Sequence, residues 1–111
     1  MRHTFDGHLL LIVLSGPLGL HQRMPWVEQA QELLDALRPG CLVVELPSAF
    51  VTAAALSAVL RTHDACARRK IPMAVASLSL QVRGTLNANN PDMSLHAGTV
   101  EATAAVTGQV R

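Results

Sequence analysis

Apolar residues along the chain fall into short runs separated by Gly, Pro and Asp, and the first two runs predict a β-hairpin. Residues 2–5 and 9–15 flank Asp6-Gly7, a dipeptide typical of the tight turn between two antiparallel strands. The six consecutive apolar residues 9–14 indicate that the second strand is covered on both faces. We therefore expect this strand to lie inside a sheet rather than at its edge.

Beyond the hairpin, segments with helical periodicity alternate with short apolar runs. Helices are expected over residues 25–37 and 53–69, from Ser77 or Ser79 through residue 86, and from a cap at Thr99 through about residue 106. Strands are expected over residues 41–46, 73–76 and 93–97. This alternation predicts an α/β fold with a mixed sheet of four or five strands, parallel core strands, an N-terminal hairpin strand and about four helices.

The two longer helices are expected to be amphipathic. In the first, the apolar stripe consists of Trp26, Val27, Ala30, Leu33, Leu34 and Leu37. In the second, the predicted core face consists of Leu56, Val59, Leu60, His63 and Ala67. Both faces are expected to contribute to the hydrophobic core.

Length, composition and charge limit the function classes. The chain has 111 residues, enough for a single domain over residues 1–111, and we expect residues 1–4 and 107–111 to fray. Half of the residues are apolar but only 3% are aromatic, so the core should be aliphatic. A formal net charge of +1 gives no basis for binding nucleic acid or an anionic membrane. The charged fraction of 15% favours protein partners.

The apolar runs and the cysteines predict a cytoplasmic location. No run approaches the ~18 apolar residues of a membrane span, so membrane insertion is not expected. Cys41 and Cys66 are far apart in sequence and form no C-x-x-C pair. That pattern is typical of reduced, buried thiols in a cytosolic protein.

The sequence lacks the motifs of the common enzyme classes, including G-x-S-x-G and G-x-x-x-x-G-K. His63 and Cys66 lie on one helical face and would supply two ligands of a metal site, but a zinc site needs three or four, so a packed His and a buried Cys are favoured. Glu45 lies at the end of a buried strand, where a carboxylate can act as a base or bind Mg²⁺. We favour the alternative that it is a solvated charge at the rim of the sheet. We predict no enzyme activity, no cofactor and no metal.

Four segments together resemble the STAS domain, which occurs in bacterial anti-sigma factor antagonists. Leu14-Ser15-Gly16-Pro17-Leu18 resembles the family's L-x-G-x-L-D, and Leu42-Val43-Val44-Glu45-Leu46 resembles its L-V-L-D-L. Residues 56–70 resemble the helix that ends in a basic run, and Gly98-Thr99-Val100-Glu101-Ala102 resembles the T-x-E-E-A opening of the last helix. The resemblance extends from about residue 5 to residue 106 and implies a STAS-like fold.

The chain departs from this family at its phosphorylation motif. In the family, the turn before the second helix reads F-I-D-S-S-G-L, and a partner kinase, itself the anti-sigma factor, phosphorylates the first serine. Aligned on that motif, Thr52 stands at the aspartate and Ala53 at the acceptor serine. Ala53 has no hydroxyl to phosphorylate. Thr52 is expected to cap the helix, the alternative being that it is a substitute acceptor.

The resemblance implies a regulatory protein-binding module that lacks the usual phosphorylatable serine. The expected partner is an anti-sigma factor of the serine kinase type or a related regulator, and a homodimer is left open. The alternative is a standalone STAS subunit of a lipid-transport ABC system or of a stress-signalling complex. The residues expected to contact the partner are Leu18, Leu20, Pro47, Ser48, Thr52, Ala53, Ala54, Ser57 and Arg61.

Overall fold

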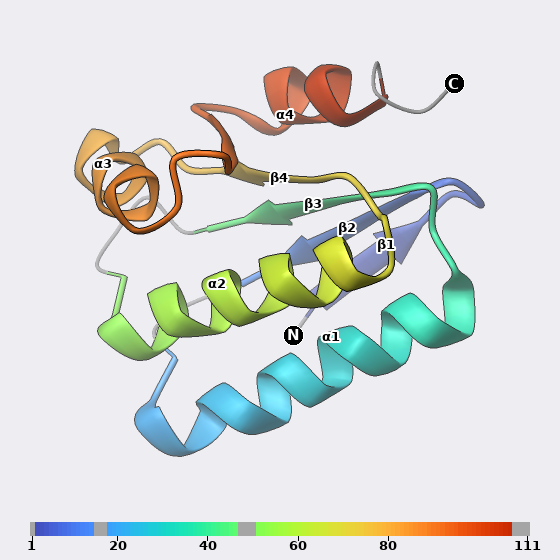
Figure 1. Ribbon diagram of the computed structural model, residues 1–111, viewed down its shortest axis with the longest axis horizontal. Coiled ribbons are helices and arrows are strands. Elements are labelled where there is room, and N and C mark those ends of the chain that lie inside the picture. The colour runs from blue at the N-terminus through green and yellow to red at the C-terminus, as the bar shows by residue number, and fades with distance from the viewer. Residues whose placement is uncertain (1, 15–17, 47–50, 108–111) are drawn as a thin grey trace.

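The computed structural model describes residues 2–14, 18–46 and 51–107, and their strands form one sheet with helices on both faces (Figure 1). In this described part, the five strands are β1 (Arg2–Phe5), β2 (Leu9–Val13), β3 (Cys41–Glu45), β4 (Met73–Ala76) and β5 (Ser94–His96), and they lie in the sheet in that order. β1 pairs antiparallel with β2, and the later pairings are parallel. The predicted mixed sheet with an N-terminal hairpin is confirmed.

The hairpin turn is held by the side chain of Asp6. Its Oδ1 accepts hydrogen bonds from the backbone N–H of Leu9 at 2.7 Å and of His8 at 2.9 Å. These bonds lower the pKa of the Asp6 carboxyl. Gly7 has a φ of 97°, which a residue with a side chain rarely adopts. Residues 2–4, expected to fray, are paired with β2 instead.

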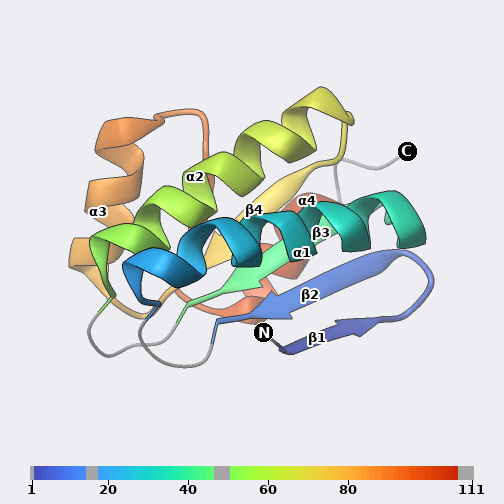
Figure 2. The ribbon, with the colours of Figure 1, turned by 90° about the horizontal axis from the view of Figure 1, so that it is seen from below.

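The helices of the described residues are α1 (Arg23–Leu37), α2 (Ala53–Arg68), α3 (Leu80–Asn89) and α4 (Thr99–Thr107), with a short 3₁₀ helix, η1 (Leu20–Gln22), before α1. Viewed from below, α1 and α2 lie side by side across one face of the sheet (Figure 2). α4 covers the opposite face (Figure 1). α3 extends to Asn89, three residues beyond the predicted end, and Ser79 is its N-cap.

Strand alternation divides the core into two clusters. The larger one lies between the sheet and the α1–α2 layer and includes Leu42 and Val44 of β3. The smaller one lies beneath α4 and includes Cys41 and Val43 of the same strand, together with Val106 of α4. These four residues of β3 have no exposed surface, and Glu45 at the end of the strand is half-buried. Residues 41–44 are therefore the buried centre of the molecule, as their uninterrupted apolar run predicts.

The prediction that β2 is covered on both faces is only half right. Leu10 and Ile12, which face the α1–α2 layer, are fully buried. Leu9, Leu11 and Val13 face the other way and are only half-buried. The reason is that α4 has nine residues and lies against β3, β4 and β5, leaving β2 at the margin of its cover.

The predicted core face of α2 is also wrong in part. The buried residues are Ala54, Ala55, Ala58, Val59, Thr62, Ala65 and Cys66, whereas Leu56, Leu60 and His63 are half-buried and Ala67 is exposed. α2 packs against α1 as well as the sheet (Figure 2). The small side chains face inward, where they allow close approach, and the leucines fill the flanks of the contact.

Candidate functional site

The sequence-predicted site lies at the carboxyl edge of the parallel strands. β3 ends at Glu45, and α2 begins at Ala53 after the connecting turn. Pro47 and Ser48, two of the predicted contact residues, lie outside the described residues. Because the carboxyl ends of parallel strands meet at one edge, the starts of α2, α3 and α4 are all found there.

Thr52 joins two segments that are distant in the sequence. As the N-cap of α2, its Oγ1 accepts a hydrogen bond from the backbone N–H of Ala55 at 3.0 Å. The same hydroxyl donates to the backbone carbonyl of Leu18 at 2.7 Å. The prediction that Thr52 caps the helix is therefore confirmed. Its hydroxyl also fixes the segment before α1 against the start of α2.

Three predicted contact residues form one face of α2. Ala53 is exposed at the first helical position, Ser57 is half-buried one turn later, and Arg61 is exposed a further turn along. Residues four apart on a helix are surface neighbours, so these three side chains form a continuous strip. We call Ala53, Ser57 and Arg61 the α2 docking face.

Two other predicted contact residues are buried rather than exposed. Leu18 is only 6% exposed and belongs to the main core cluster, and Ala54 is 8% exposed. Both side chains lie beneath the surface. Their burial argues against direct contact with a partner. Leu20 is the first residue of η1, two positions after Leu18, whose carbonyl accepts the bond from Thr52.

The start of α2 carries an uncompensated positive partial charge. Its first turn contains no acidic residue, whereas Asp or Glu commonly occupies that position. The side chain of Ala53 is a methyl group, which cannot accept a phosphoryl group. The start of α2 therefore favours a polar or acidic group nearby, and the Ala53 side chain offers no hydroxyl for phosphorylation.

Glu45 is more constrained than the predicted rim charge. It is half-buried, and its Oε1 accepts a hydrogen bond from Thr99 Oγ1 at 2.7 Å. Thr99 was expected to cap the last helix, but it is the first residue of α4 and its hydroxyl points to β3 instead. A pocket of about 320 Å³ lies beside this pair.

The candidate metal pair has other roles. His63 Nδ1 lies 3.1 Å from the side-chain amide nitrogen of Asn90, which follows α3. Burial raises the pKa of the Cys66 thiol to about 12, so the thiolate needed for metal binding is scarce near neutral pH. Among the described residues, no group of three or more His, Cys, Asp and Glu side chains is placed to hold a metal ion.

Among the described residues, no helix combines the length and the apolarity of a membrane span.

Two contacts at this edge were not predicted from the sequence. Thr52 reaches a carbonyl 34 positions away, and Thr99 reaches a carboxylate 54 positions away. Neither pair has a local sequence signal. The topology alone indicates them, because parallel strands bring their carboxyl ends to one edge.

Two solved structures share this fold over nearly the whole chain. One comes from work on the molecular architecture of the stressosome, a signal integration and transduction hub; it is 11% identical, has a TM-score of 0.81 and is matched over 99% of each chain. The other is an anti-sigma factor antagonist from Mycobacterium paratuberculosis; it is 18% identical, has a TM-score of 0.72 and is matched over 96% of this chain and 92% of that one. No protein-family model matches, and neither does any curated protein. At these identities the likeness establishes the fold, and the expected STAS-like architecture is confirmed.

Proposed function

We propose that this protein is a regulatory protein-binding module of the anti-sigma factor antagonist kind, whose docking surface is not switched by phosphorylation at the usual position. The observation that carries the proposal is Ala53, exposed at the first position of α2 in a fold of this kind. A methyl group there means that the Ala53 side chain cannot acquire the negative charge of a phosphate. Binding is then controlled by the presence of the partner rather than by modification of this residue.

The bonds of Thr52 argue against its use as a substitute acceptor. Its oxygen caps α2 and its proton is donated to Leu18, so phosphorylation would remove the bond to Leu18. A kinase would also need the half-buried hydroxyl to be released from the core edge before transfer. Thr52 thus acts as a fixed structural support of the α2 docking face.

The proposed partner is an anti-sigma factor of the serine kinase type or a related regulatory protein. A second candidate function is that of a subunit in a stress-signalling complex. It is favoured by the likeness to a stressosome structure, which covers 99% of each chain with a TM-score of 0.81. Both candidates use protein–protein docking, and they differ in the assembly that the module joins.

The test is binding of a purified candidate regulator to the Ala53→Asp variant, measured by calorimetry. We expect binding to weaken by about 2 kcal/mol or more, the scale of an unpaired interfacial charge. The melting temperature should be unchanged or slightly higher, because an acidic residue suits the first turn of a helix.

Two variants control this experiment. Ala53→Ser should bind like the wild type, because its side chain is small and uncharged. Ala67→Asp places the same charge at the opposite end of α2, where the side chain is also exposed, and should leave binding intact. If Ala53→Asp binds the regulator as tightly as the wild type does, the α2 docking face is not the contact.

A further inference from the structure

We propose that the pocket beside Glu45 receives a lysine or arginine side chain from a partner protein. We call it the Glu45 pocket; it has a volume of about 320 Å³ and opens at the carboxyl edge, between the ends of β3 and β4 and the start of α4. The residues that carry the argument are Leu46, Ala76, Leu78 and Ala97 on its walls, with Glu45 and Thr99 among its polar groups.

The walls suit the aliphatic stem of a long basic side chain. Leu46 and Ala76, 4% and 2% exposed, form a floor that belongs to the core. Leu78 and Ala97 line the same pocket and are exposed. Lysine and arginine commonly lay their methylene groups along apolar surface while the charged end stays with a polar partner.

The negative charge of Glu45 in the pocket favours a cationic ligand. Glu45 uses Oε1 to accept the bond from Thr99, and no hydrogen bond to its Oε2 is found from the described residues. Among the described residues, those that line the pocket include no Lys, Arg or His. The carboxylate of Glu101 folds back against Gly98 at the same helix start and adds negative charge. A cationic side chain would neutralise Glu45 in a partly desolvated place.

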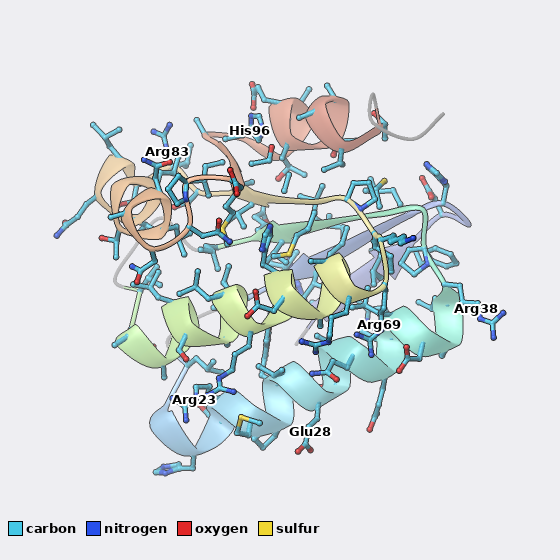
Figure 3. The ribbon with its side chains drawn as sticks, in the orientation of Figure 1. Arg23, Glu28, Arg38, Arg69, Arg83 and His96 are labelled. Atoms are coloured by element: carbon cyan, nitrogen blue, oxygen red, sulfur yellow. The ribbon has the colours of Figure 1, made fainter. Side chains whose placement is uncertain are left out.

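The cations of the described residues do not pair with Glu45. Arg2 and His3 line a neighbouring pocket with Glu45, and Arg2 lies on the same sheet face, since it pairs with Val13 and Val13 pairs with Glu45. Neither forms an ion pair with that carboxylate in the described structure. His96 lies beside α4 (Figure 3), but its Nε2 is 2.7 Å from Ser94 Oγ and it does not line the pocket.

The exposed rim indicates that the cation comes from a protein segment rather than from a free amine. Leu78 is 70% exposed at the start of α3, and Val100 is 81% exposed at the start of α4. Leu80, two residues after Leu78, is 75% exposed. Large apolar side chains on both sides of a charged pocket are typical of a protein contact, in which a buried ionic anchor is surrounded by apolar surface.

The Glu45 pocket lies at the same sheet edge as the α2 docking face and extends the surface of the proposed function. Its test does not depend on that function, because it uses small probes instead of the regulator. The probes are n-butylguanidinium, n-butanol, and two blocked pentapeptides of sequence Leu-Ala-X-Ala-Val, in which X is arginine or its neutral isostere citrulline. Binding is followed by amide chemical shifts of the intact protein.

We expect the arginine peptide to shift the amides of Glu45, Leu78 and Thr99 and to bind about tenfold more tightly than the citrulline peptide, a ratio typical of one charge-assisted contact. The arginine peptide should also bind more tightly than n-butylguanidinium, and n-butanol should not bind. In the Glu45→Gln variant, whose amide oxygen still accepts from Thr99, the preference for arginine should disappear. The control is Glu28→Gln, which removes the same charge from the outer side of α1 (Figure 3) and should change nothing.

Each other outcome overturns the proposal. If the two peptides bind the wild type equally, recognition of a cation is excluded. This comparison uses the wild type alone, so it does not depend on whether a variant folds. A preference for arginine that survives in Glu45→Gln would place the cation elsewhere. If n-butylguanidinium binds as tightly as the arginine peptide does, the pocket is a site for small free cations. That result would exclude recognition of a protein segment.

Discussion

At the scale of single residues, Thr52 acts as a structural support at the start of α2. One hydroxyl satisfies a free amide of α2 and a carbonyl of the segment before α1. A side chain with both bonds engaged is a poor candidate for modification, and the neighbouring Ala53 has nothing to modify. The start of α2 is therefore fixed in one state by two adjacent residues.

Replacing Thr52 by Val keeps the shape of the side chain and removes both hydrogen bonds. We expect the free energy of unfolding to fall by about 1–2 kcal/mol, the cost of losing an N-cap together with a buried partner for the Leu18 carbonyl. Thr52→Ser should remain close to the wild type. Urea unfolding of the three proteins measures the difference, and a Val variant as stable as the wild type would mean that the cap contributes nothing.

The sequence predicted the cap but not the second bond of Thr52. Capping is local, because Thr52 and Ala55 are neighbours in the chain. The bond to Leu18 depends on how two connecting segments meet above the sheet, which no local pattern encodes. For the same reason, Leu18 and Ala54 were expected at the surface and are buried.

The two cysteines should be unreactive in the folded protein. Both are buried, and burial raises the pKa of Cys66 to about 12 and that of Cys41 above its ordinary value. Because the thiolate is the reactive form, we expect a disulfide reagent at pH 8 to label neither thiol on the time scale on which it labels both after unfolding. Rapid labelling of native protein, measured by absorbance, would contradict this burial.

At the scale of elements, the C-terminal ends of α1 and α2 are joined by one ion pair. Arg69 Nε and Nη2 donate to the two carboxylate oxygens of Asp35 at 2.8 and 3.2 Å. Arg38 and Lys70, which follow the two helix ends, have positive φ values of 47° and 56°. Glycine is the usual residue for that conformation, so the positive φ values of these two basic residues were not predicted.

Removal of the Asp35 charge should make stability less dependent on acid pH. The bond from Arg69 lowers the pKa of Asp35 below its ordinary value of 3.8, so the ionised form stabilises the fold at pH values above 3.8. That contribution is lost as the pH falls through the lowered pKa. Asp35 is exposed, so the effect should be small and reduced by salt.

The measurement is the melting temperature of wild type and Asp35→Asn between pH 7 and pH 2. The variant should melt slightly below the wild type at neutral pH, and the two should converge in acid. Glu28→Gln, which changes an exposed carboxylate on the same helix with no partner among the described residues, is the matched control. A gap that persists unchanged at pH 2 would mean that the ion pair is not its cause.

At the scale of the whole molecule, the sheet is buried unevenly. β3 lies between two neighbouring strands and two helical layers, whereas the residues of β1 are mostly exposed. The alternation of apolar runs and helical segments was enough to predict the strand types and a sheet of four or five strands. The incomplete cover of β2 was not predictable, because it depends on the length and position of α4 rather than on the composition of β2.

This gradient should be visible in backbone hydrogen exchange. We expect the amides of β3 and its neighbours in β2 and β4 to exchange most slowly, at the rate set by global unfolding. Those of β1 and β5 should exchange faster through local opening at the two sheet edges. Deuterium uptake followed by two-dimensional NMR tests this order, and protection of β1 equal to that of β3 would contradict it.

The strand order also bears on how the protein is made. Each strand pairs with the strand that precedes it in the chain, so a growing polypeptide can add strands one after another at the same edge without inserting any between earlier partners. α4 follows all five strands and is the last helix of the described chain to leave the ribosome. Until then Val43, Ala74 and Ala76 have no helix above them. A nascent chain stalled before residue 99 should therefore be a preferred client of chaperones that bind exposed apolar strands, and release of α4 should end that dependence.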